Sequence, residues 1–308
     1  IAYAGNLGRH LGQTRQINTV PYGAQFRPEN ADPTNPGTPV PDNFFRPYVG
    51  YGNLPYLEFS GTSSYHSLQS QVNRRFSKGL QFGVAWTWSK AMNYGDSYDS
   101  GIAVYNNPRF WNYGPGGYDR THTLVGNWVW QIPKGSRIWD SVLTRLVLDN
   151  WQFSGICAFV SGSPQGISLS LADSANLTGG GDGNTVVKTG SAVLSKSQRT
   201  FNRFFDTSVF ARPAKFERGS GSGASRYAYR GPGVNNWDLT FFKNVPLREK
   251  LTFQFRWEMY NAFNHTQFDA VDNSARFDAS GNLINTRFGQ ITGSRDARIQ
   301  QMSLRLQF

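Results

Sequence analysis

The chain has 308 residues, of which 38% are hydrophobic and 15% aromatic, and its mean hydropathy is −0.49. No run approaches the roughly 20 apolar residues of a spanning helix, which excludes a helical membrane protein. The formal charge of +11 is scattered along the chain, so it indicates lipid head groups or an anionic solute as partners and no nucleic acid. So many aromatic residues with so few aliphatic ones are rare in soluble globules and typical of transmembrane β-barrels.

Apolar and polar residues alternate along eight segments, which is the period of a β-strand. Residues 80–89 (LQFGVAWTWS) show the pattern most clearly, and a short turn with glycine precedes them. Each segment is about long enough to cross a bilayer at a tilt. The predicted strands are residues 1–12, 66–76, 80–89, 121–132, 151–162, 235–245, 251–260 and 298–308.

The connections between these strands alternate strictly between short or compact and long. The compact ones are 77–79, 133–150 and 246–250, and the second of them contains a predicted amphipathic helix at 139–148. The long ones, rich in Gly, Asn, Tyr and Pro, are 13–64, 90–120, 163–234 and 262–297. The compact turns therefore share one end of the sheet with the C-terminus. Outer-membrane barrels have this arrangement, with periplasmic turns and long extracellular loops.

The two faces of the predicted strands differ in polarity. A dry sandwich core would not accept the charged groups unpaired, whereas a water-filled lumen does. Candidates for lining the lumen, where they would contact a solute or hold a plug, are Arg75, Arg256, Glu258 and Arg305. On the apolar faces, the tryptophans predicted to face lipid as an aromatic girdle are Trp86, Trp88, Trp128, Trp130, Trp237 and Trp257.

Residues 93–118 form an unusually aromatic connection. It could be a ligand-capture surface on the external side, since aromatic rings stack on sugars and anchor peptides, or it could pack on itself at the mouth of a barrel. The candidate ligand-facing residues are Tyr94, Tyr98, Tyr105, Phe110, Trp111 and Tyr113.

No pattern points to catalysis. Cys157 is the only cysteine, and the four histidines lie far apart without metal-ligand spacing. The glycine runs 179–183 and 219–223 lack the Lys-Ser/Thr of a phosphate loop. Asp173, Asp182 and Asp206 do not have the spacing of a calcium loop. We therefore expect no cofactor, no metal site and no enzymatic activity.

The chain closes on a strand that resembles the C-terminal strand of bacterial outer-membrane barrels, which the barrel assembly machinery reads. Its apolar positions are Met302, Leu304, Leu306 and Phe308. Longer segments resemble the C-terminal barrel of TonB-dependent outer-membrane receptors of the Oar-like type. They are YHSLQSQVNRRFSKGLQFGVAWTWSKAM (65–92), YDRTHTLVGNWVWQIP (118–133), WQFSGICAFVSGSP (151–164) and YRGPGVNNWDLTFFKNVPLREKLTFQFRWEMYNAFNHTQF (229–268).

The resemblance implies a protein of the bacterial outer membrane that imports a scarce, bulky solute with energy from the inner membrane. Members have about 22 strands around a plug domain that couples to the TonB system. This chain supplies about eight strands and no plug. We therefore expect residues 1–308 to be part of a longer protein and to form an open, curved antiparallel sheet with two unpaired edges and long extracellular loops.

Two other functions share the same strand pattern. A passive diffusion porin would have no plug upstream. A small closed barrel of eight strands, acting as an anchor or adhesin, would require the first strand to pair with the last.

Overall fold

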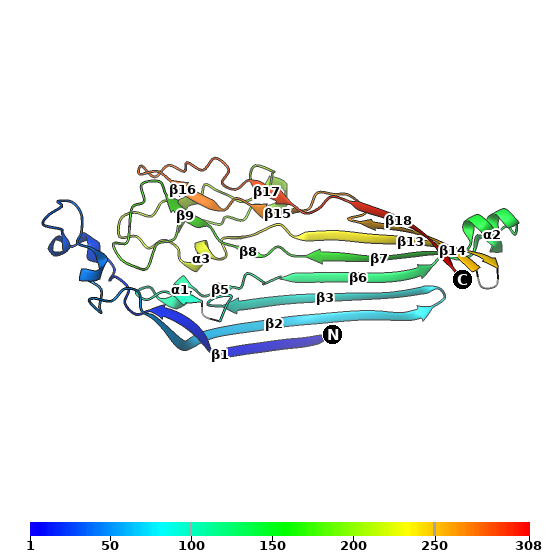
Figure 1. Ribbon diagram of the computed structural model, residues 1–308, viewed down its shortest axis with the longest axis horizontal. Helices are drawn as coiled ribbons and strands as arrows, with labels where there is room; N and C mark the ends of the chain where they lie inside the picture. Colours follow the sequence, from blue (N-terminus) through cyan, green and yellow to red (C-terminus); the bar gives the residue numbers. More distant parts are fainter. Residues whose placement is uncertain (99, 249–250) are drawn as a thin grey trace.

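The computed structural model describes residues 1–98, 100–248 and 251–308, and one large sheet dominates it (Figure 1). Eight long strands form most of this sheet. They follow one another in chain order, and each is antiparallel to the next. The predicted all-β antiparallel architecture is confirmed. The long strands are β1 (Ala2–Gln16), β2 (Pro55–Ser77), β3 (Leu80–Asn93), β6 (His122–Gln131), β7 (Trp151–Val160), β13 (Val234–Arg248), β14 (Leu251–Tyr260) and β18 (Ile299–Gln307).

Cross-strand register joins the apolar faces of the separate strands into one surface. Residues directly opposite each other in an antiparallel pair point to the same side of the sheet. Phe241 of β13 lies opposite Phe153 of β7 and Trp257 of β14, and Phe153 lies opposite Trp130 of β6. The ring centroids of Phe153 and Phe241 are 4.7 Å apart. The sheet therefore has one apolar face and one polar face.

The sheet is open within the described residues. β18 pairs with β14 alone, while β1 pairs with β2 and, through Thr14 and Arg15, with the two-residue strand β4 (Gly101–Ile102). The two edges predicted from the sequence are thus β1 and β18.

The turn between β2 and β3 consists of Lys78 and Gly79, whose φ angles are 52° and 81°. Two positive φ values are typical of the type I′ turn, whose twist matches that of the flanking strands. A Cβ atom on Gly79 would also lie 2.9 Å from the carbonyl oxygen of Gln131. Glycine is therefore required here for space as well as for backbone conformation.

The connection from β6 to β7 holds the 3₁₀ helix η4 (Gly135–Arg137) and the helix α2 (Val142–Leu148). The helix predicted at 139–148 is confirmed but begins at Val142, because Ser141 is extended and its hydroxyl accepts a hydrogen bond from the Thr144 N–H at 3.1 Å. The predicted turn at 246–250 is shorter than expected, since β13 continues to Arg248. Residues 249 and 250 lie outside the described residues.

The hairpin of β1 and β2 is longer than predicted. Its register continues until Gln16 lies opposite Pro55, with irregularities between Gly8 and Gln13. The predicted strands ended at residue 12 and began at residue 66, because the apolar alternation weakens in this outer part. That part reaches beyond β3, whose pairing with β2 stops where Met92 lies opposite Ser64.

The long connections contain structure that the sequence did not predict. Four two-stranded sheets form within the described residues: β8 with β12, β9 with β16, β10 with β11, and β15 with β17. We call residues 17–54, 94–98, 100–121, 161–233 and 261–298 the loop cap. Its strands are β4, β5 (Gly114–Pro115), β8 (Pro164–Gln165), β9 (Ser168–Leu171), β10 (Val187–Lys188), β11 (Phe210–Ala211), β12 (Tyr229–Arg230), β15 (Phe268–Val271), β16 (Ser274–Phe277) and β17 (Ile291–Ser294).

The helices of the loop cap are short. They are α1 (Pro108–Trp111), α3 (Ser222–Ser225) and the 3₁₀ helices η1 (Ala24–Phe26), η2 (Pro28–Asn30), η3 (Asp42–Phe44) and η5 (Lys196–Gln198). In the part of the chain that the structure describes, no helix combines the length and the apolar character needed to span a membrane.

The main hydrophobic core lies in the loop cap and not beneath the sheet. Phe205 and Phe277 are 1% and 2% exposed. The ring of Phe205 stacks on Tyr229 with centroids 4.3 Å apart and meets Phe288 edge-on at 5.2 Å. The core draws on the β7–β13 and β14–β18 connections, which lie side by side at one end of the sheet in Figure 1. The cap is therefore a packed layer.

Leu239 and Thr240 are neighbours on β13 that point to opposite faces, which allows a matched test. We expect Leu239→Arg, on the apolar face, to lower the free energy of unfolding in lipid vesicles by about 2–4 kcal/mol, because charges on the lipid face of a barrel are destabilising. Thr240→Arg, which introduces the same side chain opposite Glu258, should change it by less than about 1 kcal/mol. Urea titration of the intact protein in vesicles measures both. Equal effects would show that the two faces do not meet different solvents.

Candidate functional site

Charged and amide side chains gather on the polar face near the β18 edge. Arg256 and Glu258 of β14 form an ion pair, and the Arg256 guanidinium lies 4.9 Å from the ring centroid of Phe242. The side-chain amide of Gln254 donates a hydrogen bond to Asn244 Oδ1 at 3.0 Å. The Arg256 side chain is still 40% exposed, so a positive charge remains accessible on this face.

Three of the four predicted lumen residues lie close together. Arg305 of β18 lies opposite Gln254, two positions along from the pair formed by Arg256 and Ser303. Arg75 lies apart, near the short-turn end of β2, where its side chain is exposed. The structure thus groups Arg256, Glu258 and Arg305, and leaves Arg75 separate.

The register places all six predicted girdle tryptophans on the apolar face. Trp128 and Trp237 meet edge-on with ring centroids 6.1 Å apart. Trp88 is the most exposed of them, at 52%. The rings of Trp128 and Trp237 therefore form one continuous aromatic surface that extends from β6 to β13. That this surface marks a membrane interface stays a prediction.

The aromatic connection is partly packed and partly exposed. The rings of Tyr94 and Tyr113 lie 5.2 Å apart, and the Arg109 guanidinium lies 4.7 Å from the Tyr113 centroid. Tyr98 and Phe110 are 65% and 54% exposed. The structure therefore places some of these rings in contacts within the cap and others at its surface.

Tyr105 and its neighbours are fixed by a carboxylate from another loop. Asp182 accepts hydrogen bonds from the backbone N–H groups of Val104, Tyr105 and Asn106, at 2.7 to 3.1 Å. The Tyr105 hydroxyl donates to the carbonyl oxygen of Thr19 at 2.9 Å. Three consecutive amides on one carboxylate hold this turn of the aromatic connection in one conformation.

Trp111 ends the single-turn helix α1, which begins after Asn107. The Asn107 side chain accepts a hydrogen bond from the Arg109 N–H at 2.9 Å. The carbonyl oxygens of Phe110 and Tyr113 both accept a hydrogen bond from the Ser222 hydroxyl, at 2.9 and 2.8 Å. The β7–β13 connection thus also holds this part of the aromatic segment.

Two arginines fasten the cap to the end of β3. Arg226 donates to the backbone carbonyl oxygens of Asn93 and Asn112 and, at 2.8 Å, to Asn93 Oδ1. Arg230 pairs with the fully buried carboxylate of Asp119 at 2.5 Å, and Asp119 also accepts the N–H of Ala91 at 2.7 Å. Burial lowers the pKa of the Arg226 guanidinium, and Asp96 partly offsets this effect.

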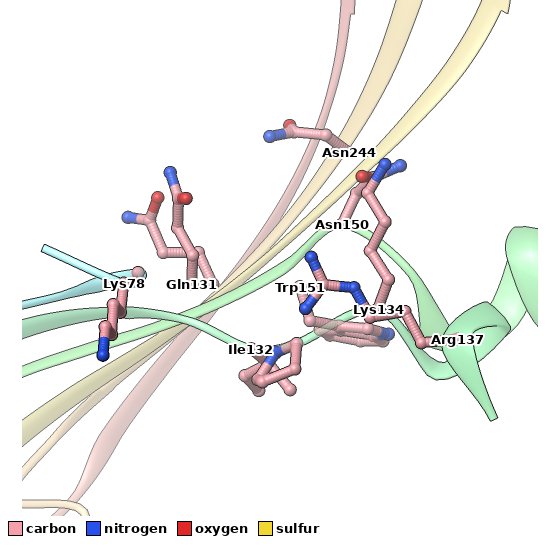
Figure 2. A pocket seen from close by; sticks show the side chains of 11 residues that line it. Lys78, Gln131, Ile132, Lys134, Arg137, Asn150, Trp151 and Asn244 are labelled. Carbon is pink, nitrogen blue, oxygen red and sulfur yellow. The ribbon is translucent and has the colours of Figure 1, made fainter.

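A pocket of about 200 Å³ opens beside the aromatic connection. Residues 93–98 and Tyr118 line one side, and residues 11–13, 62 and 63 of the β1–β2 hairpin line the other. It therefore brings Tyr94 and Tyr98 of the predicted capture surface to the long-loop end of the sheet. A larger pocket of about 660 Å³ lies at the opposite, short-turn end (Figure 2).

In residues 1–98, 100–248 and 251–308, no group of three or more His, Cys, Asp or Glu side chains could hold a metal ion. Asp173 instead pairs with Arg212 at 2.7 Å, and this hydrogen bond lowers the pKa of the Asp173 carboxyl. Asp206 pairs with Arg203 at 2.8 Å. Cys157 lies on the apolar face opposite Trp237.

The closing strand β18 exposes its apolar side chains. Met302, Leu304 and Leu306 lie on the apolar face and are 64%, 68% and 52% exposed, and Phe308 follows the strand. The residues predicted to form the assembly signal are thus accessible at an edge of the sheet.

The geometry agrees with a comparison against known families. A family model described as an outer membrane beta barrel domain matches residues 1–301. The chain belongs to this outer-membrane β-barrel family. It is therefore a protein of the bacterial outer membrane. Neither the comparison with curated proteins nor the comparison with solved structures gave a match.

Because the chain belongs to this family, the general arrangement of such barrels indicates which parts of the fold meet lipid, the lumen, the periplasm and the outside of the cell. Barrels of the outer membrane turn their apolar face to lipid and their polar face to the lumen, with short turns in the periplasm and long loops outside. By this rule the loop cap of the barrel is extracellular, and the Lys78–Gly79 turn and α2 are periplasmic.

Sequence reasoning missed the residues that hold the cap together. The sequence pattern marks Asp182 only as an acidic residue without calcium-loop spacing, and it indicates no role for Arg226 or Asp119. Arg226 and Asn93 are 133 residues apart in the chain. A lone charged residue in a Gly- and Ser-rich segment is the only local signal, and it does not identify such a distant partner.

Asp182 allows a direct test of how the aromatic connection is held. We expect Asp182→Ala to accelerate hydrogen exchange at the amides of Val104, Tyr105 and Asn106 by about tenfold or more, because hydrogen bonds to a charged group contribute about 1.5–3 kcal/mol. Exchange mass spectrometry of the intact protein measures this. Asp269→Ala removes an exposed carboxylate elsewhere in the cap and should leave these amides unchanged. Unaltered exchange in Asp182→Ala would contradict the assigned role.

Proposed function

We propose that this barrel domain belongs to a TonB-dependent transporter that imports a scarce, bulky solute across the outer membrane. The observation that carries the proposal is the pairing of eight consecutive long strands without a pairing between β1 and β18 in the described residues. A closed barrel of eight strands has an interior just filled by side chains. A wall that continues beyond both edges would enclose a wider lumen. The resemblance of residues 65–92 and 229–268 to Oar-like receptors supports the same proposal.

The surface of the polar face suits a passage for a solute. Two positions near its centre on β3 carry little or no side chain: Gly83, opposite Asn127, and Ala85, opposite Val125. The exposed Arg256 guanidinium and Arg305 lie toward β18, and would attract an anionic group. We propose that Arg75, Arg256, Glu258 and Arg305 line the solute path or contact a plug.

Solute capture is proposed for the extracellular side, at the pocket of Tyr94, Tyr98 and Tyr118. Exposed rings that are held by a rigid backbone bind sugars or peptides with little loss of entropy. Arg226 supports this backbone from a neighbouring loop, since it donates hydrogen bonds to the carbonyl oxygen and to Oδ1 of Asn93, which lines the pocket.

The remaining parts of the proposal concern partners and chemistry. We propose that the barrel assembly machinery reads β18, that the TonB system acts through a plug domain, and that lipid covers the apolar face. We also propose that the domain needs no cofactor and has no enzymatic activity.

The transporter and a passive porin differ in conductance and in partner. We expect the intact protein to give no steady ion conductance in planar bilayers, because a plug would occupy the lumen. We also expect the purified periplasmic domain of TonB to bind it in isothermal titration calorimetry. A refolded general porin is the control for conductance. Steady open conductance without TonB binding would contradict the proposal and favour a porin.

A further inference from the structure

The connection between β6 and β7 carries a set of exposed apolar side chains. We call residues 138–148, which end with α2, the apolar spur. Figure 1 shows α2 at the short-turn end of the sheet, which is the periplasmic end of the barrel. Ile138, Trp139, Val142 and Leu143 are 94%, 76%, 82% and 73% exposed, and the last three residues of α2 are each more than half exposed. Apolar side chains exposed together in this way mark a surface that contacts a membrane or a protein.

Two side chains of the apolar face hold the end of the spur. Trp151 of β7 and Lys243 of β13 lie opposite each other on this face. The indole N–H of Trp151 donates to the carbonyl oxygen of Val147 at 2.7 Å, and the Lys243 ammonium group donates to the carbonyl oxygen of Asp149. Both hydrogen bonds start from the side of the wall that faces lipid in such barrels. The end of α2 is therefore held on the lipid side of the wall and not on the lumen side.

Hydrogen bonds at the base of the spur join its two ends. Asp149, which follows the spur, is 5% exposed. Its carboxylate accepts hydrogen bonds from the Ser136 N–H at 3.0 Å and from the Ser136 hydroxyl at 2.6 Å, just before the spur begins. The spur is therefore a closed loop that presents its apolar side chains on the outside.

The charges of the spur suit the boundary between lipid and water. Its only charged residues are Asp140 and Arg145. The Arg145 guanidinium donates to both carboxylate oxygens of Asp140 at 2.6 Å, so the two charges are paired. Lys134 and Arg137 precede the spur in the chain. Basic residues beside an exposed tryptophan and a short apolar helix are typical of segments that lie in the head-group region of a membrane.

We propose that the apolar spur inserts into the periplasmic leaflet of the outer membrane and anchors this end of the barrel wall to lipid. Its apolar side chains contact acyl chains, and the pair of Asp140 with Arg145 lies among the head groups. Lipid is favoured over a protein of the periplasm as the occupant, because the apolar surface of the wall continues into the spur at Trp151. The inference rests on the barrel family and on the position of the short turns, and it does not depend on transport or on TonB.

Three exposed valines allow a matched test of what surrounds the spur. Val142 of the spur, Val84 on the apolar face of β3 and Val193 in the loop cap are 82%, 38% and 59% exposed. Each is changed in turn to cysteine and given a nitroxide label, in the intact protein in lipid vesicles, with Cys157 and every other native cysteine changed to serine. Electron paramagnetic resonance then compares relaxation of the label by oxygen, which dissolves in lipid, and by a water-soluble nickel chelate.

We expect the label in Val142→Cys to prefer oxygen as the label in Val84→Cys does, and to lose the nickel accessibility that the label in Val193→Cys shows. Only the protein and lipid are present in the vesicles, so a surface that waits for a protein partner would stay in water. Equal nickel accessibility in Val142→Cys and Val193→Cys would overturn the proposal and favour a periplasmic protein as the occupant.

A second experiment measures whether the contact with lipid stabilises the barrel. The triple variant Val142→Ser, Leu143→Ser, Leu146→Ser should lower the urea concentration at which the intact protein unfolds in vesicles. The control Phe44→Ser, Val49→Ser, Tyr51→Ser removes three exposed apolar side chains from the connection between β1 and β2, and should not change it. Heat-dependent migration in gel electrophoresis checks that both variants are folded.

An unchanged urea midpoint in the spur variant, or an equal shift in the control variant, would overturn the proposed anchor. Conductance and TonB binding are measured separately, so a failure of the proposed transport function would leave this result standing.

Discussion

A strand that crosses lipid must find a hydrogen-bond partner for every backbone N–H and C=O group, and this constraint organises the chain. Each long strand therefore pairs with its neighbours in sequence, except where one strand extends beyond the next, as β2 extends beyond β3. The pairing also fixes the faces, since a slip of one residue would turn Phe241 and its row toward water. Among the eight long strands, as far as the structure describes the chain, β1 and β18 keep a largely unpaired side. A larger barrel would satisfy those groups with further strands, and it would remove the edges that otherwise promote aggregation.

The placement of the hydrophobic core follows from the same constraint. A barrel wall meets lipid on one face and water on the other, so its strands need no covering layer. The long connections meet only water and must bury their own apolar groups, which they do around Phe205, Tyr229 and Phe277. Arg226 and Arg230 then tie this independent core to the end of β3. The wall and the cap are stabilised by different interactions, which join at a few charged contacts.

The sequence predicted the wall well and the cap poorly, for one physical reason. A strand between two solvents shows its structure as a local period of two, visible in residues 80–89 and 251–260 without any knowledge of their partners. The cap depends on contacts between distant segments, such as Asp182 with Tyr105, which leave no periodic signal. Even within the wall, the outer part of the β1–β2 hairpin escaped prediction because lipid does not impose alternation there. The candidate lumen residues could be assigned to a face, but not to the ion pair of Arg256 with Glu258.

β2 is much longer than a strand needs to be to cross the bilayer. A tilted strand spans the hydrocarbon with about 9–11 residues, and β2 has 23. At about 3.3 Å per residue, the remainder extends roughly 40 Å along the strand direction. Residues 17–54, which connect β1 and β2, therefore lie at the far end of the molecule from the short turns (Figure 1). A large molecule that approaches from outside the cell would therefore meet residues 17–54 before it reaches the mouth of the lumen.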